Sequence, residues 1–99
     1  MINKNEFGSI EISQKAYEDM VMIAIKGVKG VAPSKKDTNK IECTFKNDEL
    51  KIHLEVKMKT GIDVVKTSNK LQNKIHEIIL EMTGIDCKNI DVEVVGFVA

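Results

Sequence analysis

The side chains best suited to chemistry in this sequence are two thiols and two imidazoles. Cys43 and Cys87 lie far apart, with no CxxC pair and no neighbouring histidine pair, so their spacing does not match a zinc site. His53 and His76 have no nucleophile motif beside them, because the sequence contains no GxSxG, Walker A, HExxH or EF-hand pattern. We therefore expect no catalytic residue, no metal ligand and no cofactor, and we predict that the protein is not an enzyme.

These four side chains are better explained as structural residues. Cys43 falls in the inward phase of a predicted strand at 41–45, so we expect a packed, reduced thiol. Cys87 falls in the predicted loop after the second helix, where more exposure is expected. His53 points outward from a strand and His76 flanks the apolar stripe of a helix, so both are expected at the surface or at its boundary.

The basic residues also limit the chemistry. All fifteen are lysines, they are balanced by fifteen acidic residues, and the formal net charge is +0. Neutral charge and the lack of arginine argue against a nucleic-acid binder that depends on bulk electrostatics. Lys66, Lys70 and Lys74 repeat every four residues and share one face of a predicted helix. That basic surface is either a site for anionic lipid or an acidic partner, or an ordinary solvated helix face.

A second motif lies at the end of the first predicted helix. Gly27, Lys29 and Gly30 belong to a GxxG pattern, which KH domains use to bring the backbone close to RNA phosphates. The alternative is a helix C-cap followed by a turn. Pro33 and the polar run at 34–40 favour that alternative, because a KH domain needs a helix directly after its GxxG loop.

The length and composition indicate one small soluble domain. The chain has 99 residues, of which 42% are hydrophobic and 30% charged, so we expect a single domain over residues 1–99. The sequence contains no apolar run long enough for a transmembrane helix, and its first residues lack the apolar segment of a signal peptide. We therefore expect a cytoplasmic protein.

The periodicity of apolar residues predicts six elements in the order β-α-β-β-α-β. Alternation predicts strands, helical spacing predicts helices, and Ser13 and Asp63 are suitable N-caps. The expected elements are a strand at 8–12, a helix at 14–26, strands at 41–45 and 50–59, a helix at 64–82 and a strand at 90–98. The expected fold is a two-layer α+β sandwich, with a four-stranded antiparallel sheet and both helices on one face. The topology is ferredoxin-like, with a KH-like sheet as the alternative.

The same patterns predict the core. Helical spacing and strand alternation give one inward row for each element. The expected inward residues are Ile10 and Ile12; Ala16, Met20, Val21, Ile23 and Ala24; Ile41, Cys43 and Phe45; Leu50, Ile52, Leu54, Val56 and Met58; Val64, Ser68, Leu71, Ile75, Ile78, Ile79 and Met82; and Ile90, Val92 and Val94.

Three large apolar residues fall outside that core pattern. Strict alternation places Phe7, Val95 and Phe97 on the sheet face away from the helices, where antiparallel pairing of the first and last strands would group them. Such a group is typical of a surface for a protein partner or for self-association. The alternative is a bulge at Gly96 that turns Phe97 back into the core.

Several short segments together resemble the alkaline shock protein family, the envelope stress response proteins of Gram-positive bacteria. The resemblance spans nearly the whole chain through the order and spacing of these segments. They are Gly8 to Ser13, Gly27 to Val31, the strand that leads into Gly61 and Ile62, Gln72, Met82 to Gly84, and Ile90 to Val94. The sequence departs from the family pattern at Thr60, near Asp63 and at Asp91.

The resemblance implies a non-enzymatic cytoplasmic protein that joins the inner face of the membrane through a partner. We expect an interaction or scaffold protein that binds itself or a membrane-associated protein, with Phe7, Val95 and Phe97 as the contact residues. Two alternatives stay open. One is a KH-like RNA-binding module, although nucleic acid is the less favoured partner. The other, implied by the resemblance, is an accessory partner of a fatty-acid or dihydroxyacetone-type kinase.

Overall fold

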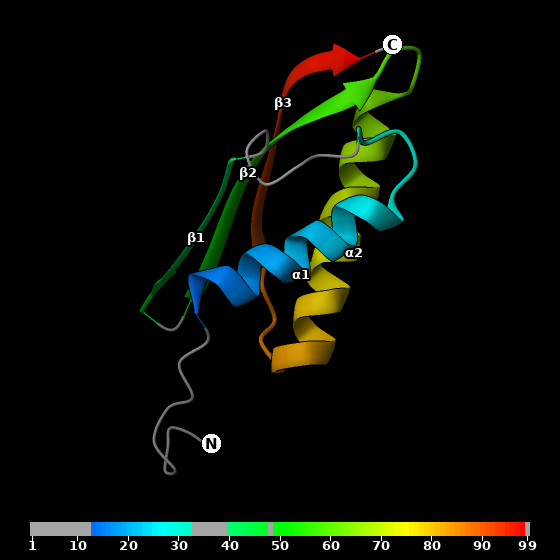
Figure 1. Ribbon diagram of the computed structural model, residues 1–99. Helices are drawn as coiled ribbons and strands as arrows, with labels where there is room; N and C mark the ends of the chain where they lie inside the picture. Colours follow the sequence, from blue (N-terminus) through cyan, green and yellow to red (C-terminus); the bar gives the residue numbers. More distant parts are fainter. Residues whose placement is uncertain (1–12, 33–39, 48, 99) are drawn as a thin grey trace.

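The computed structural model describes residues 13–32, 40–47 and 49–98, which form two helices and a three-stranded sheet. Both helices lie on the same face of the sheet, so the molecule has two layers (Figure 1). This confirms the expected α+β class and the placement of the helices. The strand predicted at 8–12 and Phe7 lie outside the described residues, and a fourth strand is therefore not part of the described sheet.

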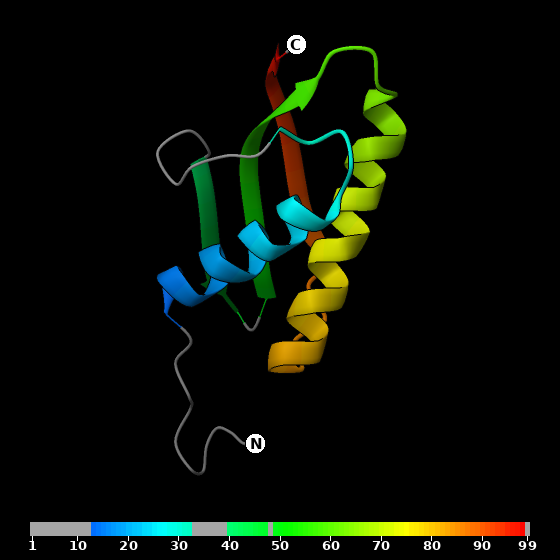
Figure 2. The ribbon, with the colours of Figure 1, turned by 45° about the vertical axis from the view of Figure 1, so that its right-hand side comes forward.

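Helix α1 spans Gln14–Gly27 and crosses the strands obliquely (Figure 2). It begins where the Ser13 side chain accepts a hydrogen bond from the amide of Ala16 at 3.1 Å, as expected of an N-cap. Its buried face consists of Tyr17, Val21, Ala24 and Ile25. The prediction that Ile23 faces inward is wrong, since this side chain is half exposed and lies two positions from Val21, on the opposite side of the helix.

Strands β1 (Lys40–Lys46) and β2 (Glu49–Lys59) form an antiparallel hairpin. The hairpin turns at Asn47, whose φ of 53° lies in the left-handed region that asparagine tolerates. Alternate residues of β2 are buried beneath the helices, as predicted. Phe45 was expected to point into the core, but 54% of it is exposed. It lies near the end of β1, an edge of the described sheet, where Leu50 is its neighbour across the hairpin.

Helix α2 (Val64–Thr83) connects β2 to strand β3 (Asn89–Val98). Asp63 caps its first turn and Gly84, with a φ of 77°, ends it in the left-handed conformation. The buried face is Thr67, Leu71, Ile75 and Ile79. Met82 was predicted to continue this face but is exposed, because the last turn of the helix extends beyond the core.

The sheet has the order β1-β2-β3, and β3 runs parallel to β2. The prediction of a fully antiparallel sheet is therefore wrong for the described strands. The helical crossover from β2 through α2 returns the chain to the same end of the sheet, which makes the neighbouring strands parallel. The ferredoxin-like order would place the first strand between these two, whereas here they pair directly.

Candidate functional site

The C-terminal half of β3 exposes two large apolar side chains. Val95 is 46% exposed and Phe97 is 57% exposed, and Gly96 lies between them. The pairing with β2 shifts at this point, from Val56 opposite Val94 to Lys57 opposite Gly96. Val95 is thus an extra residue in β3. This is the irregularity that the alternative interpretation expected near Gly96, yet Phe97 remains largely in solvent.

The shift changes how Phe97 relates to the rest of β3. It places Phe97 opposite Met58, a fully buried residue, whereas Asp91 and Glu93 lie opposite the outward-facing His53 and Glu55. In the register, Phe97 therefore lies beside the buried row of β2, whereas Asp91 and Glu93 lie beside its outward-facing row. Both apolar side chains belong to an edge strand, because β3 pairs only with β2 among the described strands.

Lys66, Lys70 and Lys74 of α2 are exposed, and Lys70 and Lys74 lie beside the GxxG loop. A shallow depression at the end of α1 has a volume of about 550 Å³. Its lining includes residues of two features noted in the sequence, the GxxG loop and the lysine row. The lining residues are Gly27, Val28, Lys29, Lys70, Asn73, Lys74 and Glu77. Lys66 lies on the same helix outside that lining.

The second glycine of the GxxG pattern has a structural role. The carbonyl of Gly30 accepts a hydrogen bond from the amide of Lys59 at 2.7 Å, and the amide of Ala32 donates to the carbonyl of Lys57 at 2.9 Å. Val31 forms an antiparallel bridge with Met58. The loop therefore leads into a short pairing with β2 and not directly into a helix, which is the outcome expected of a helix end and turn.

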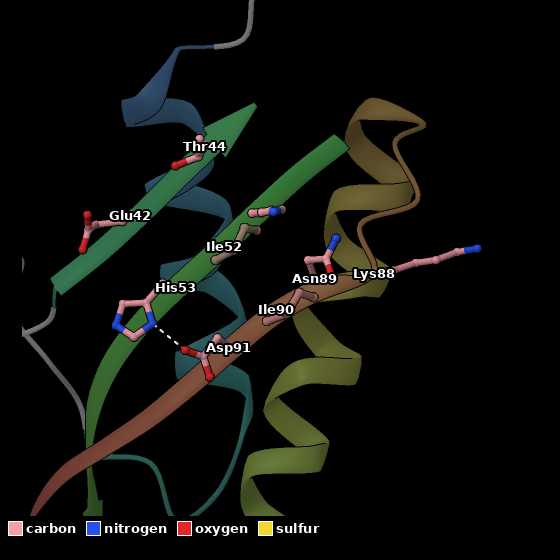
Figure 3. Close-up of a pocket in the computed structure, with 9 residues that line it drawn as sticks. Glu42, Thr44, Ile52, His53, Lys88, Asn89, Ile90 and Asp91 are labelled. Atoms are coloured by element: carbon pink, nitrogen blue, oxygen red, sulfur yellow. Dashed lines mark hydrogen bonds and ion pairs between the residues drawn. The ribbon is translucent and has the colours of Figure 1, made fainter. Parts of the chain in front are cut away.

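The sheet face opposite the helices, here called the open face, carries a histidine among carboxylates. The His53 Nδ1 atom lies 2.7 Å from Asp91 Oδ2, and Figure 3 shows the ring turned toward that carboxylate. On the other side of the ring, Nε2 lies 3.7 Å from Glu55 Oε2 and 3.8 Å from Glu93 Oε1. We call these four residues the His53 cluster. The hydrogen bond to Asp91 is the main cause of a raised pKa of His53.

The sequence does not show that the four residues of the His53 cluster meet. His53 and Glu55 are two apart on β2, and Asp91 and Glu93 are two apart on β3, so each pair faces one side of its strand. This shared two-residue spacing was the available signal. It becomes informative only with the parallel register, which sets His53 beside Asp91 and Glu55 beside Glu93.

The second histidine and the cysteines complete the set of reactive groups. His76 Nε2 lies 2.5 Å from Asp86 Oδ1, and this hydrogen bond is the main reason that the pKa of Asp86 is lowered.

Burial, followed by the charge of Glu18, raises the pKa of Cys43 to about 11. Cys87 was expected to be exposed, but it is 1% exposed, because the loop after α2 folds onto the start of β2. Burial also raises its pKa.

The elements described so far define a class of protein: a small two-layer α+β domain with helices on one face of a mixed sheet. Residues 31–99 match the alkaline shock protein 23 family, described by a cell envelope-related function. The chain belongs to this family, and the resemblance noted from its sequence is confirmed.

Comparison with solved structures supports the fold. The chain is similar to the MamM CTD, solved as a point variant in a copper form, with a TM-score of 0.58 and 10% sequence identity. The match covers 85% of this chain and 98% of that one. No curated protein matches the sequence. Within the described residues, neither helix is long and apolar enough to cross a membrane.

Proposed function

We propose that this protein is a non-catalytic interaction module with a cell envelope-related role, and that it associates with a second copy of itself through β3. The observation that carries the proposal is the exposure of Val95 and Phe97 on an edge strand of the described sheet. Exposed apolar side chains next to unpaired backbone groups favour addition of another strand.

The charge pattern of β3 selects how two copies would meet. Its first half carries Asp91 and Glu93, and its second half carries Val95 and Phe97. In an antiparallel pair about a twofold axis at Val95, the two Val95 residues are neighbours and Glu93 of each copy is in register with Phe97 of the other, so these acidic residues do not oppose each other. An axis near Val92 would instead set Asp91 against Glu93, and like charges directly opposite each other are destabilising. The apolar half is therefore the expected contact.

Light scattering after size-exclusion chromatography tests this association. The wild-type chain should form a dimer whose population rises with concentration, and the Val95→Ser/Phe97→Ser variant should be monomeric with unchanged circular dichroism. Phe45→Ser is the matched control, because Phe45 is 54% exposed on the other edge strand of the described sheet. A monomeric wild type, or a double variant that still dimerises, contradicts the proposed contact.

Wild type and the Val95→Ser/Phe97→Ser variant also test for a membrane-associated partner. In a pull-down from solubilised membranes, we expect wild type to recover protein that the double variant does not. Recovery of one membrane protein or kinase subunit by a monomeric wild type would replace self-association with that partner.

An RNA-binding role is the second candidate, favoured by the hollow that joins Lys29 to Lys70 and Lys74. It predicts binding of a single-stranded RNA oligonucleotide at low salt, which the Lys70→Glu/Lys74→Glu variant weakens. Fluorescence polarisation with labelled RNA gives the answer. Equal polarisation for wild type and variant would remove this candidate.

A further inference from the structure

We propose that the His53 cluster is a binding site for a divalent transition metal ion of the zinc type. The ligands are the Nε2 atom of His53 and one carboxylate oxygen each from Glu55 and Glu93, and Asp91 orients the imidazole. Solvent completes the coordination. Of its residues, Glu93 also takes part in the proposed pairing of β3, whereas His53 and Glu55 lie on β2.

The geometry supplies the first argument. The three ligand atoms lie within 4.8 Å of one another, with Nε2 at 3.7 Å and 3.8 Å from the two glutamate oxygens. Tetrahedral zinc with bonds of about 2.0 to 2.1 Å holds its ligands about 3.4 Å apart. Small rotations of the two glutamate side chains close that difference, and both carboxylates have solvent beside them to allow it.

The hydrogen bond to Asp91 supplies the second argument. A metal-binding histidine commonly donates its other ring nitrogen to a carboxylate, which fixes the tautomer and aims the free lone pair at the metal. In this arrangement Nδ1 of His53 donates to Asp91 (Figure 3). The other ring nitrogen, Nε2, lies near Glu55 and Glu93. The parallel register holds all four residues on adjacent strands of one sheet, so the site is built on rigid elements.

The charge balance supplies the third argument. Glu55 and Glu93 are direct neighbours in the register, and like charges in this position repel each other. Lys40 lies opposite Glu55 on β1, but its ammonium pairs with Glu42 at 3.5 Å. Among the described residues, the ion-pair partner of each is His53. Three carboxylates around one imidazole leave a net negative charge even when the ring is protonated. An imidazole ligand beside carboxylates suits zinc better than calcium or magnesium, which prefer oxygen ligands alone.

Zinc chloride titrated into the 99-residue chain tests the site by calorimetry and by NMR of the imidazole groups. The chain has two histidines, so the NMR signals separate the His53 cluster from His76. We expect the signals of His53 to shift on zinc binding and those of His76 to stay in place. His53→Gln should abolish binding, and Asp91→Asn should weaken it about tenfold.

His76→Gln is the matched control, because His76 also pairs with an aspartate but lies outside the cluster. It should bind zinc like wild type. Circular dichroism of each variant confirms that it is folded. The proposal is overturned by an absence of binding at about 1 mM zinc, by wild-type affinity in folded His53→Gln, or by binding that is lost only in Cys43→Ala.

Discussion

The thiol of Cys87 donates a hydrogen bond to the carbonyl oxygen of Leu50 over 3.2 Å, and this contact joins the loop after α2 to the start of β2. Both residues are buried. Replacing Cys87 by alanine removes the thiol, which leaves the Leu50 carbonyl without this donor and opens a small void. We expect Cys87→Ala to lower the free energy of unfolding by about 1 to 2 kcal/mol in urea denaturation. A free energy of unfolding equal to that of wild type in Cys87→Ala would show that the contact does not stabilise the fold.

The two cysteines should differ in their reaction with thiol reagents. Cys43 is partly exposed and Cys87 is buried, and burial raises the pKa of both thiols. Since the thiolate is the reactive form, both should react slowly at neutral pH. Mass spectrometry after timed alkylation should find Cys43 modified first and Cys87 modified only as the protein unfolds. Faster modification of Cys87 would contradict its burial.

The two glycines of the GxxG pattern should respond differently to alanine. Gly30 has a φ of 96°, and a methyl group there would lie 3.4 Å from atoms of Ile62 and Thr67. Gly30→Ala should therefore cost about 1 to 2 kcal/mol. Gly27 ends α1, and its added methyl would meet a single lysine methylene at 3.5 Å, so Gly27→Ala should be neutral or slightly stabilising. Equal urea midpoints for the two variants would refute this difference.

The His76–Asp86 pair should make stability depend on acidic pH. The pKa of Asp86 is lowered in the folded protein, chiefly by the His76 hydrogen bond, so the charged carboxylate favours folding. Its contribution is present above the ordinary aspartate pKa and is lost as the pH falls through the lower folded value.

Urea denaturation of wild type and Asp86→Asn at several pH values measures this contribution. The stability difference should shrink toward zero as the pH is lowered below the ordinary aspartate range. Asp19→Asn, at an exposed position of α1, is the control for general charge effects. A difference that does not vary with pH would mean that Asp86 stabilises the fold in another way.

The N-cap of α2 gives a further prediction. The Asp63 side chain accepts a hydrogen bond from the amide of Lys66 at 3.1 Å. Asp63→Ala removes this acceptor and should destabilise the protein by about 1 kcal/mol, whereas Asp63→Asn should retain most of the stability. Thermal unfolding of the two variants distinguishes the capping interaction from a loss of charge alone.

Local sequence patterns predicted the described elements to within one residue at their ends. Ser13, Asp63 and Gly84 act at the positions where caps were expected, and the alternation along β2 matches its buried row. These features depend on neighbours within a few residues, which the sequence displays directly. The errors at Phe45 and Met82 arose because apolar spacing does not reveal where the opposing layer ends. The error at Ile23 arose because apolar residues lie on both sides of α1 and their spacing does not show which side meets the sheet.

The sequence by itself determined the α+β class, the family, the exposed lysine row and the two apolar residues of β3 that reach solvent. Only the tertiary structure decided that β3 runs parallel to β2, that Cys87 is buried and that His53 meets Asp91. The physical reason is that alternation along a regular strand sets which face a side chain occupies, whereas the path of the chain through α2 sets which strands become neighbours, and the register shift at Val95 appears only when they pair. The His53 cluster exists because that path aligns two pairs of residues far apart in sequence.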